Sequence, residues 1–356
     1  MSWADLDRAQ AAAGATCDDT FGVRVPRAFG SPQREWQAVR RAVGILDARH
    51  RGLIAVTGED RITFLQGQLT NDVKQLAPGS GTHAALLTIQ GRVVADLYVF
   101  VLADRVLLDV PAIRVDAVRK ALERFIIADD VELAIGDDMD ALLSIEGPRA
   151  APLLSDVTGA TLADLQPYQH REITIDSVTV RVVAIGQTGE TGFRLLSARA
   201  NAATVWQRLT AAGATPVGLD ALNVLRLEAG IPWYGLDMDE ETLVMEVGLD
   251  DAISFSKGCY LGQEVVERVA ARGHVNRKLS GLVGEASIVP PAGTTLTRDG
   301  KDVGHVTSAA ASPALSSIIA LGYVHRSAGD IGTVLQAGVN DQPIDLTITA
   351  RPFYRS

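Results

Sequence analysis

The spacing of apolar residues between about residues 36 and 270 switches between helical and strand-like periods. A helical period covers WQAVRRAVGILDA, residues 36–48, and a second predicted helix carries apolar side chains at Ile62, Phe64, Leu65 and Leu69. Strand-like runs include LIAVTG, HAALLTI and RVVADLYVFVLA, the last two separated by Gln90-Gly91 as a hairpin turn. The pattern therefore predicts helices and strands mixed along the chain.

The same mixture continues through the following residues. A strand VLLDV precedes a long amphipathic helix at residues 113–127, which predicts a sheet backed by helices. A second such passage begins at ALLSIEGP and contains the strands ITIDSVTVRVVAI and FRLLSA and a helix at residues 200–212. The order of elements is loosely repeated, although no internal repeat aligns in sequence. We therefore expect an α+β fold.

Beyond about Asn276 the chain consists of short β-rich runs, LSGLVG, TTLT, DVGHVTS, IIALGYV and IDLTITA, separated by Gly- and Pro-containing turns. Strands at this spacing are typical of a small antiparallel barrel or sandwich. We place the boundary near residues 272–278, which gives domains at residues 1–272 and 273–356. No low-complexity linker marks it, so we expect the two parts to pack closely.

Composition and charge exclude several classes of function. The 33 basic and 43 acidic residues give a net charge of -10, which opposes nonspecific binding to nucleic acid or anionic lipid. The longest apolar stretch, residues 93–103, is interrupted by Asp96 and is too short to span a bilayer, and the N-terminus lacks a secretory signal. We expect a cytoplasmic protein with no direct nucleic-acid or membrane partner.

The only cysteines are Cys17 and Cys259, too few for a disulfide scaffold and without the clustered Cys/His spacing of a metal site. The histidines at positions 83, 170, 274 and 305 show no ligand-like clustering either. We therefore assign no metal site to this chain.

The segment SFSKGCYLGQEVVER, residues 254–268, is the most informative. Its apolar spacing predicts a helix from about Leu261, which would place Cys259 at a helix N-terminus, two residues after Lys257. A positive helix end and a nearby ammonium both favour a thiolate, so Cys259 could be reactive or bind a soft metal. Gly258 and Gly262 would let the backbone approach a ligand. The alternative is a turn glycine beside a cysteine that packs as a small apolar residue.

KGCYLGQE, residues 257–264, resembles residue for residue the K-G-C-Y/F-x-G-Q-E signature of the YgfZ family, folate-dependent helpers of iron–sulfur proteins. The resemblance implies that Lys257, Gly258, Tyr260 and Gln263 lie at a folate pocket, with Cys259 as the reactive residue beside it.

Two further segments resemble the wider superfamily that includes glycine-cleavage aminomethyltransferase. LNVLRLEAGIPWYG, residues 222–235, resembles its L-R-L-E-A-G-x-P-x-Y-G element, which implies folate contacts for Arg226 and Tyr234. The alternative for Arg226 is an ordinary ion pair on the predicted helix. T-G-E-x-G-F implies that Glu190 holds the pterin ring through parallel hydrogen bonds, whereas a turn acid is the ordinary interpretation.

Two polar positions lie in or beside the predicted apolar elements. Asp96 interrupts an apolar strand and needs a buried partner, either an arginine or a ligand. In glycine-cleavage aminomethyltransferase the comparable strand carries two successive acids after paired glycines; this chain has GRVVADL, with Ala95 and Arg92 as replacements. FLQGQLTNDV resembles the superfamily's F-L-x-G-x-L-T-N-D motif, which would place Asn71, with Gln68 and Thr70, at the pocket. A capped helix end explains Asn71 equally well.

Taken together, the resemblance implies a cloverleaf of two α+β, ferredoxin-like units and a C-terminal antiparallel β-barrel around bound tetrahydrofolate. It implies a monomer that supports assembly or repair of iron–sulfur enzymes, including those that thiolate tRNA, through transient contacts with those enzymes or with assembly proteins. One alternative is aminomethyl or methyl transfer to tetrahydrofolate with Asp96 as the acid; another is a folate-sensing scaffold without turnover. The Cys259 motif and the missing Asp-Asp pair favour the first interpretation.

Overall fold

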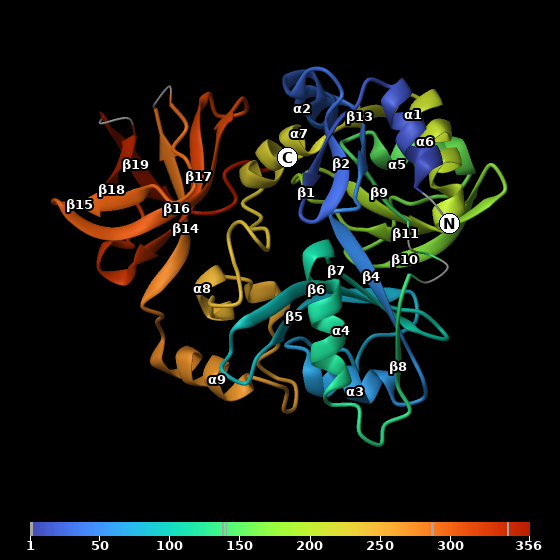
Figure 1. Cartoon of the computed structure of the whole chain (residues 1–356), viewed down its shortest axis with the longest axis horizontal. Helices are drawn as coiled ribbons and strands as arrows, with labels where there is room; N and C mark the ends of the chain where they lie inside the picture. The colour runs from blue at the N-terminus through green and yellow to red at the C-terminus, as the bar shows by residue number, and fades with distance from the viewer. Residues whose placement is uncertain (1–2, 137–138, 140, 286–287, 340–341) are drawn as a thin grey trace. The chain divides into compact units, whose positions relative to one another are not determined.

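A computed structural model describes residues 3–136, 139, 141–285, 288–339 and 342–356 (Figure 1). The chain forms two compact units. The first unit comprises Met1–Leu86, Val94–Leu222 and Asp251–Leu261, and the second comprises Leu87–Val93, Asn223–Asp250 and Gly262–Ser356. The chain therefore leaves the first unit and returns to it for eleven residues, 251–261, before it continues into the C-terminal region.

A six-stranded sheet forms one half of the first unit. Its strands lie in the order β10-β11-β12-β9-β3-β13, and all neighbours are antiparallel except β13 and β3. The strands are β3 (Gly44–Asp47), β9 (Ala141–Glu146), β10 (His170–Ile175), β11 (Val178–Ala184), β12 (Gly192–Ser197) and β13 (Thr215–Val217). Alternate strand residues such as Leu143 and Leu195 pack in one core with α1 (Ala4–Ala12), α5 (Ala150–Thr158) and α6 (Ala202–Ala211).

A hairpin of β1 (Thr16–Thr20) and β2 (Val23–Ala28) precedes α2 (Pro32–Arg41). The α2 helix begins at a side-chain cap, because the Ser31 hydroxyl accepts a 3.4 Å hydrogen bond from the Arg34 N–H. The predicted helix at residues 36–48 is therefore wrong beyond Arg41. Residues 44–47 form β3 instead, paired on both sides with β9 and β13, and tertiary pairing overrides the helical spacing.

A five-stranded sheet, in the order β5-β6-β7-β4-β8, forms the other half of the first unit. Its strands are β4 (Arg51–Thr57), β5 (Ser80–Leu87), β6 (Val93–Val101), β7 (Val106–Pro111) and β8 (Glu132–Ile135). One face carries Ile54, Leu97 and Val99 and is covered by α3 (Arg61–Gln68) and α4 (Val115–Glu123), whose apolar side chains belong to the same core (Figure 1). The other face is left for the second sheet.

The two sheets of the first unit pack against each other through these remaining faces. Leu53, Phe100 and Leu107 of the five-stranded sheet lie in one buried cluster with Leu142 and Leu196 of the six-stranded sheet. Because side chains alternate across a strand, the same faces also carry every second residue beyond this cluster. Several of those further positions carry buried polar or charged side chains, among them Arg51, Asp96 and Arg194.

The second unit contains a closed barrel with the strand order β14-β17-β16-β15-β18-β19 and antiparallel pairing throughout. The strands are β14 (Arg277–Gly284), β15 (Thr295–Arg298), β16 (Lys301–Ser312), β17 (Ser317–His325), β18 (Val334–Val339) and β19 (Gln342–Thr349). Inward residues such as Leu282, Leu296 and Leu346 fill it. The unit also holds α8 (Val244–Val247), α9 (Gln263–Arg272) and most of α7 (Leu219–Glu228).

The expected α+β fold with a C-terminal antiparallel barrel is confirmed. The division into residues 1–272 and 273–356 stays a prediction. In the structure, Asn223–Asp250 belongs to the same compact unit as the barrel. Within the described part of the chain, no helix combines the length and the apolar character needed to cross a bilayer.

Candidate functional site

A cluster of four buried charged residues lies between the two sheets of the first unit. Arg51 of β4, Asp96 of β6 and Asp109 of β7 come from the five-stranded sheet, and Arg194 of β12 comes from the six-stranded sheet. Each follows the strand alternation that places its apolar neighbours in the layer between the sheets. We call these four residues the interior ionic cluster. Its two positive and two negative charges balance.

Asp109 joins the two arginines of the cluster. Its Oδ1 accepts a 2.7 Å hydrogen bond from Arg51 Nε, and its Oδ2 accepts a 2.6 Å hydrogen bond from Arg194 Nη1. Burial acts to lower the pKa of Arg51, but the attraction of Asp109 and Asp96 exceeds it and raises that pKa. Arg51 therefore stays charged inside the protein.

Asp96 is hydrogen-bonded at only one of its two carboxylate oxygens within the described residues. It is 6% exposed, and its Oδ2 lies 3.3 Å from Arg51 Nη1. Its Oδ1 is buried and has no hydrogen-bond partner among the described residues, and the same holds for Nε and Nη2 of Arg194. Buried carboxylate oxygens and guanidinium N–H groups are normally bonded, so these atoms mark a place for a polar ligand or water.

His50 and Gln187 lie beside the cluster. His50 Nε2 is 3.4 Å from Gln187 Oε1. Burial, with the positive charges of Arg194 and Arg51, lowers the pKa of His50 to about 3, so this imidazole is neutral at physiological pH.

An aromatic wall continues the site along β6. The Tyr98 ring lies under the Arg51 guanidinium at 5.1 Å, stacks on His83 at 4.8 Å and approaches the Tyr168 ring at 5.8 Å. Burial raises the pKa of Tyr168 to about 12 and raises that of Tyr98 as well. Both phenols are therefore neutral, and they give the site a partly apolar surface suited to a flat ring.

Glu190 lies in the loop between β11 and β12, and Arg40 of α2 reaches it. Arg40 Nη1 is 2.9 Å from Glu190 Oε1 and 2.7 Å from the Thr188 carbonyl oxygen, and both charged side chains are almost fully buried. The Glu146 carboxylate supports the same loop by accepting hydrogen bonds from Gln187 N and Thr188 Oγ1. Sequence reasoning located Glu190 but gave no sign of Arg40.

Asn71 and Lys257 lie at the C-terminal end of α3. Asn71 Nδ2 is within 3.0 Å of Thr82 Oγ1 and of the carbonyl oxygens of His83 and Asp251. Lys257 Nζ donates to the carbonyl oxygens of Gln66, Leu69 and Asn71 at 2.7–2.8 Å. These contacts fasten residues 251–261 to α3, and Lys257 uses all three of its N–H groups within the protein.

Burial lowers the pKa of Lys257 to about 8, against the attraction of Asp72. Its three carbonyl partners favour the charged form, as expected for a cation at a helix C-terminus.

The rest of the KGCYLGQE segment is less enclosed. Cys259 and Gly258 are exposed, and a Cβ at Gly258 would meet nothing within 4 Å. Tyr260 is 8% exposed with the Lys257 ammonium 5.2 Å from its ring centre. The α9 helix begins at Gln263, so the predicted start at Leu261 is two residues early and Cys259 lies outside the first turn. The helix-dipole argument for a thiolate therefore does not hold, because the effect is confined to the first turn.

Arg226 and Tyr234 lie in the second unit. Arg226 is fully buried; it bonds to Asn223 Oδ1 at 2.9 Å, to Ser308 Oγ at 2.8 Å and, closely, to Asp237 Oδ2. Asp237 in turn accepts from Thr307 Oγ1 and the Trp233 N–H. We call these residues the second-unit arginine network. Tyr234 is 6% exposed.

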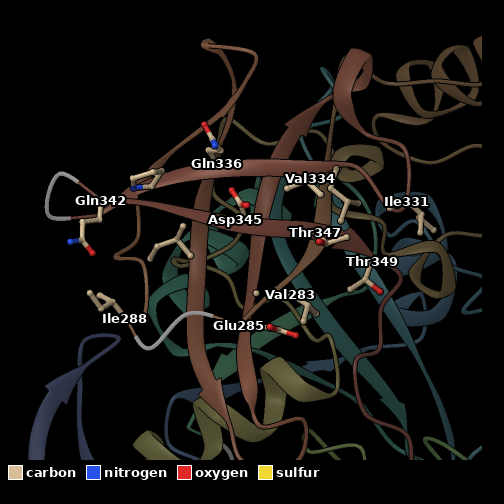
Figure 2. A pocket seen from close by; sticks show the side chains of 15 residues that line it. Val283, Glu285, Ile288, Ile331, Val334, Gln336, Gln342, Asp345, Thr347 and Thr349 are labelled. Atoms are coloured by element: carbon tan, nitrogen blue, oxygen red, sulfur yellow. The ribbon is translucent and has the colours of Figure 1, made fainter.

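A large open hollow lies on the barrel itself and has a volume of about 1210 Å³ (Figure 2). It is lined by residues of β14, β18 and β19 and of the adjoining loops, including Glu285, Gln336 and Asp345. None of the candidate site residues lines it. In the described ranges, no group of three or more His, Cys, Asp or Glu residues is placed to hold a metal ion.

Sequence reasoning missed Arg51, Asp109, Arg194 and His83. Asp109 and Arg194 each interrupt an apolar strand, as Asp96 does, so the same alternation could have indicated them, whereas Arg51 begins its strand after Arg49 and His50. His83 begins a strand-like run and gave no signal beyond its residue type.

The first unit has two helix-backed sheets that pack face to face around an ionic cluster, and the second unit has a closed six-stranded antiparallel barrel. These features define a fold of the glycine-cleavage T-protein class. The glycine cleavage system aminomethyltransferase T from Bartonella henselae has a similar structure, with a TM-score of 0.91 at 26% identity, covering 98% of this chain and 97% of that one. Two families match the sequence: the GCVT N-terminal domain at residues 6–257 and the glycine cleavage T-protein C-terminal barrel domain at residues 277–355. The chain belongs to the glycine-cleavage T-protein family.

Relatives match along almost the whole chain. An aminomethyltransferase from Streptomyces avermitilis is 34% identical over 98% of this chain and 96% of its own length. One from Bacillus subtilis is 30% identical over 95% of this chain and 94% of its own length.

These relatives correct two expectations. The function in assembly or repair of iron–sulfur enzymes, and the transient iron–sulfur partners, are contradicted, because the relatives that match from end to end are aminomethyltransferases. The eight residues of KGCYLGQE misled because a short motif was given more weight than the whole chain. The superfamily assignment is correct, but its narrower YgfZ branch is not supported.

Proposed function

We propose that this protein is a folate-dependent aminomethyltransferase. It takes the carbon of an aminomethyl group held as a thioether on a lipoyl carrier protein and transfers it to tetrahydrofolate. The observation that carries the proposal is the end-to-end match to aminomethyltransferases at 30–34% identity. The partner is then the lipoyl carrier of a glycine-cleavage system, in keeping with the structural similarity to an aminomethyltransferase of such a system.

The proposed reaction balances without an oxidant or reductant. Transfer forms two C–N bonds to the acceptor and breaks one C–N and one C–S bond of the aminomethyl thioether. Two protons leave the attacking amines; one completes ammonia and the other completes the carrier thiol. Tetrahydrofolate, when bound, supplies the two amine nitrogens that receive the carbon.

The interior ionic cluster supports this reaction. Asp96 Oδ1 is buried and lacks a partner among the residues that the structure describes, so a bound group can bond to it without displacing a protein contact. Arg51 holds the other carboxylate oxygen at 3.3 Å and fixes its orientation. We assign Asp96 the transfer of a proton from an attacking amine to the departing ammonia.

The remaining folate contacts that the resemblance implies stay proposals within each of the two units, taken separately. In the first, the residues that remain proposals are Glu190, Asn71, Lys257, Gly258 and Tyr260. Lys257 would act through the position of its segment, because all three N–H groups of its ammonium already donate to carbonyl oxygens of the protein. In the second, Tyr234 and Gln263 remain proposals, and Arg226 would act through the position of its segment, because all of its guanidinium nitrogens are bonded within the protein. Cys259 is not needed for the proposed reaction, and its catalytic role stays a prediction.

The first test uses the full-length protein, an aminomethylated lipoyl carrier protein and tetrahydrofolate under anaerobic conditions. Ammonia and methylene-tetrahydrofolate should appear in equal amounts, and calorimetry should show saturable tetrahydrofolate binding. Binding without any transfer would overturn the proposal and leave a folate-binding protein without this activity.

A variant pair localises the chemistry. Asp96→Asn should lower kcat about 100-fold or more, because loss of a positioned proton carrier typically costs that much. Asp104→Asn is the matched control, since Asp104 is exposed in the turn after β6, and it should keep kcat within twofold. Equal activity in both variants would remove Asp96 from the mechanism.

A further inference from the structure

His83 lies on the same face of the five-stranded sheet as Asp96. It belongs to β5, next to β6 in the sheet, and its ring stacks on Tyr98, two residues along β6 from Asp96. The Arg51 guanidinium bonds to Asp96 and also lies over the Tyr98 ring, 5.1 Å from the ring centre. His83 and Asp96 therefore border one stretch of the layer between the sheets.

One ring nitrogen of His83 is fixed by a carboxylate. His83 Nδ1 is 3.0 Å from Asp251 Oδ2, and the Tyr168 hydroxyl lies 3.5 Å from the same oxygen. The hydrogen bond from His83, more than any other cause, lowers the pKa of Asp251, so the carboxylate is ionised and Nδ1 carries the hydrogen. The neutral ring then has its lone pair on Nε2.

The other ring nitrogen has no partner among the described residues. His83 is 7% exposed, and its Nε2 is buried without a hydrogen bond to any of them. The titratable and charged groups around the ring are Asp251 at Nδ1, Tyr98 against its face, Tyr168 beside Asp251, and Arg51 beyond Tyr98. A buried imidazole held by a carboxylate and open at its second nitrogen has the arrangement of a general base with its orienting acid.

We propose that His83, oriented by Asp251, is a second catalytic proton carrier of aminomethyl transfer, acting alongside Asp96. This inference rests on the proposed function. The reaction moves two protons, and Asp96 Oδ1 and His83 Nε2 are both buried basic atoms of this layer without a hydrogen-bond partner in the described ranges. His83 Nε2 takes the proton of one attacking amine and gives it to the departing thiolate, so the ring ends neutral and the carrier ends as a thiol.

Two variants separate this role from a purely structural one. His83→Asn keeps an amide N–H near the position of Nδ1, so the bond to Asp251 survives, but it places nothing at Nε2. We expect kcat to fall about 100-fold while the KM for the carrier and the Kd for tetrahydrofolate change less than about threefold. Asp251→Asn keeps an acceptor for Nδ1 and removes the charge, so it should shift the acid limb of the kcat profile to lower pH.

Nitrogen NMR of the imidazole gives a readout that needs no turnover. The neutral ring of His83 should carry its hydrogen on Nδ1, with Nε2 unprotonated, and adding tetrahydrofolate should shift the Nε2 resonance. A hydrogen on Nε2 in the neutral ring, or wild-type kcat in His83→Asn, overturns the inference alone. Absence of transfer by the wild-type protein overturns the proposed function as well. If His83→Asn fails to fold, an unshifted pH profile in Asp251→Asn is the decisive negative result.

Discussion

The interior ionic cluster and the second-unit arginine network are both buried Arg–Asp assemblies, but they differ in how completely their atoms are bonded. Every nitrogen of the Arg226 guanidinium has an acceptor, and both oxygens of Asp237 accept two hydrogen bonds each. In the cluster, one oxygen of Asp96 and two nitrogens of Arg194 have no partner in the described ranges.

Burying a charge is costly unless it is paired and hydrogen-bonded, so a saturated network can be explained by folding alone. The unbonded atoms of the cluster carry a cost that folding does not explain, and a ligand that bonds to them would recover it. In this molecule, the completeness of hydrogen bonding in a buried ion pair therefore distinguishes a structural pair from a candidate functional site. Residue type and burial are the same in both and do not distinguish them.

The largest effect is expected at Asp237, where a substitution tests whether the second-unit arginine network is structural. Replacing it by alanine leaves Arg226 charged and buried without its carboxylate, which should lower the free energy of unfolding by about 3–5 kcal/mol. Urea denaturation measures the change. The control Asp302→Asn, at an exposed barrel position, should stay within about 0.5 kcal/mol of wild type. A small loss for Asp237→Ala would mean that the network contributes little to stability.

The second-largest effect is expected on the pH dependence of the free energy of unfolding, through His50 beside the interior ionic cluster. The pKa of His50, beside the cluster, is about 3 in the folded protein against an ordinary value of 6.5. Between these values the unfolded chain binds the proton and the folded protein does not, so His50 makes stability fall as pH falls, by about 1.4 kcal/mol per pH unit.

His50→Gln should therefore flatten the pH dependence of the unfolding free energy between the ordinary pKa of histidine and the lowered pKa of His50. The exposed His274 is the matched position for a control variant, His274→Gln, measured in parallel. An unchanged slope in His50→Gln would show that the imidazole is protonated with little penalty in the folded state.

The smallest effect is expected at Asp96. Asp96→Asn removes a carboxylate that is only half bonded, so the lost ion pair is offset by relief of the charge's desolvation, and the free energy of unfolding should change by less than about 1 kcal/mol. Urea denaturation in parallel with the transfer assay would check this. A loss as large as that of Asp237→Ala would place Asp96 among structural ion pairs and weaken its assignment to catalysis.

The sequence was sufficient to predict the element types and some polar positions, because alternation and turn residues are local signals. Asp96 was found because it interrupts an apolar strand, and the barrel because its strands are short and separated by turns. The partner of Asp96 was not found, since Arg51 is 45 residues away and reaches it through the order of strands in the sheet.

His83 shows the same limit more sharply. It was set aside for lack of neighbouring ligands in sequence, yet Asp251, its partner, lies 168 residues further along the chain. The predicted end of the helix at residues 36–48 was wrong for a different reason. Residues 44–47 have helical spacing, but pairing with two other strands decides their conformation.

The return of residues 251–261 to the first unit has a consequence for how the protein is made. Asp251 and Lys257 belong to this short segment, and they complete the contacts of His83 and of the α3 C-terminus. During synthesis from the N-terminus, the first unit lacks these contacts until residue 261 has left the ribosome, after all of Asn223–Asp250. Its proposed proton-transfer layer is therefore finished late in translation, when more than two thirds of the chain has been made.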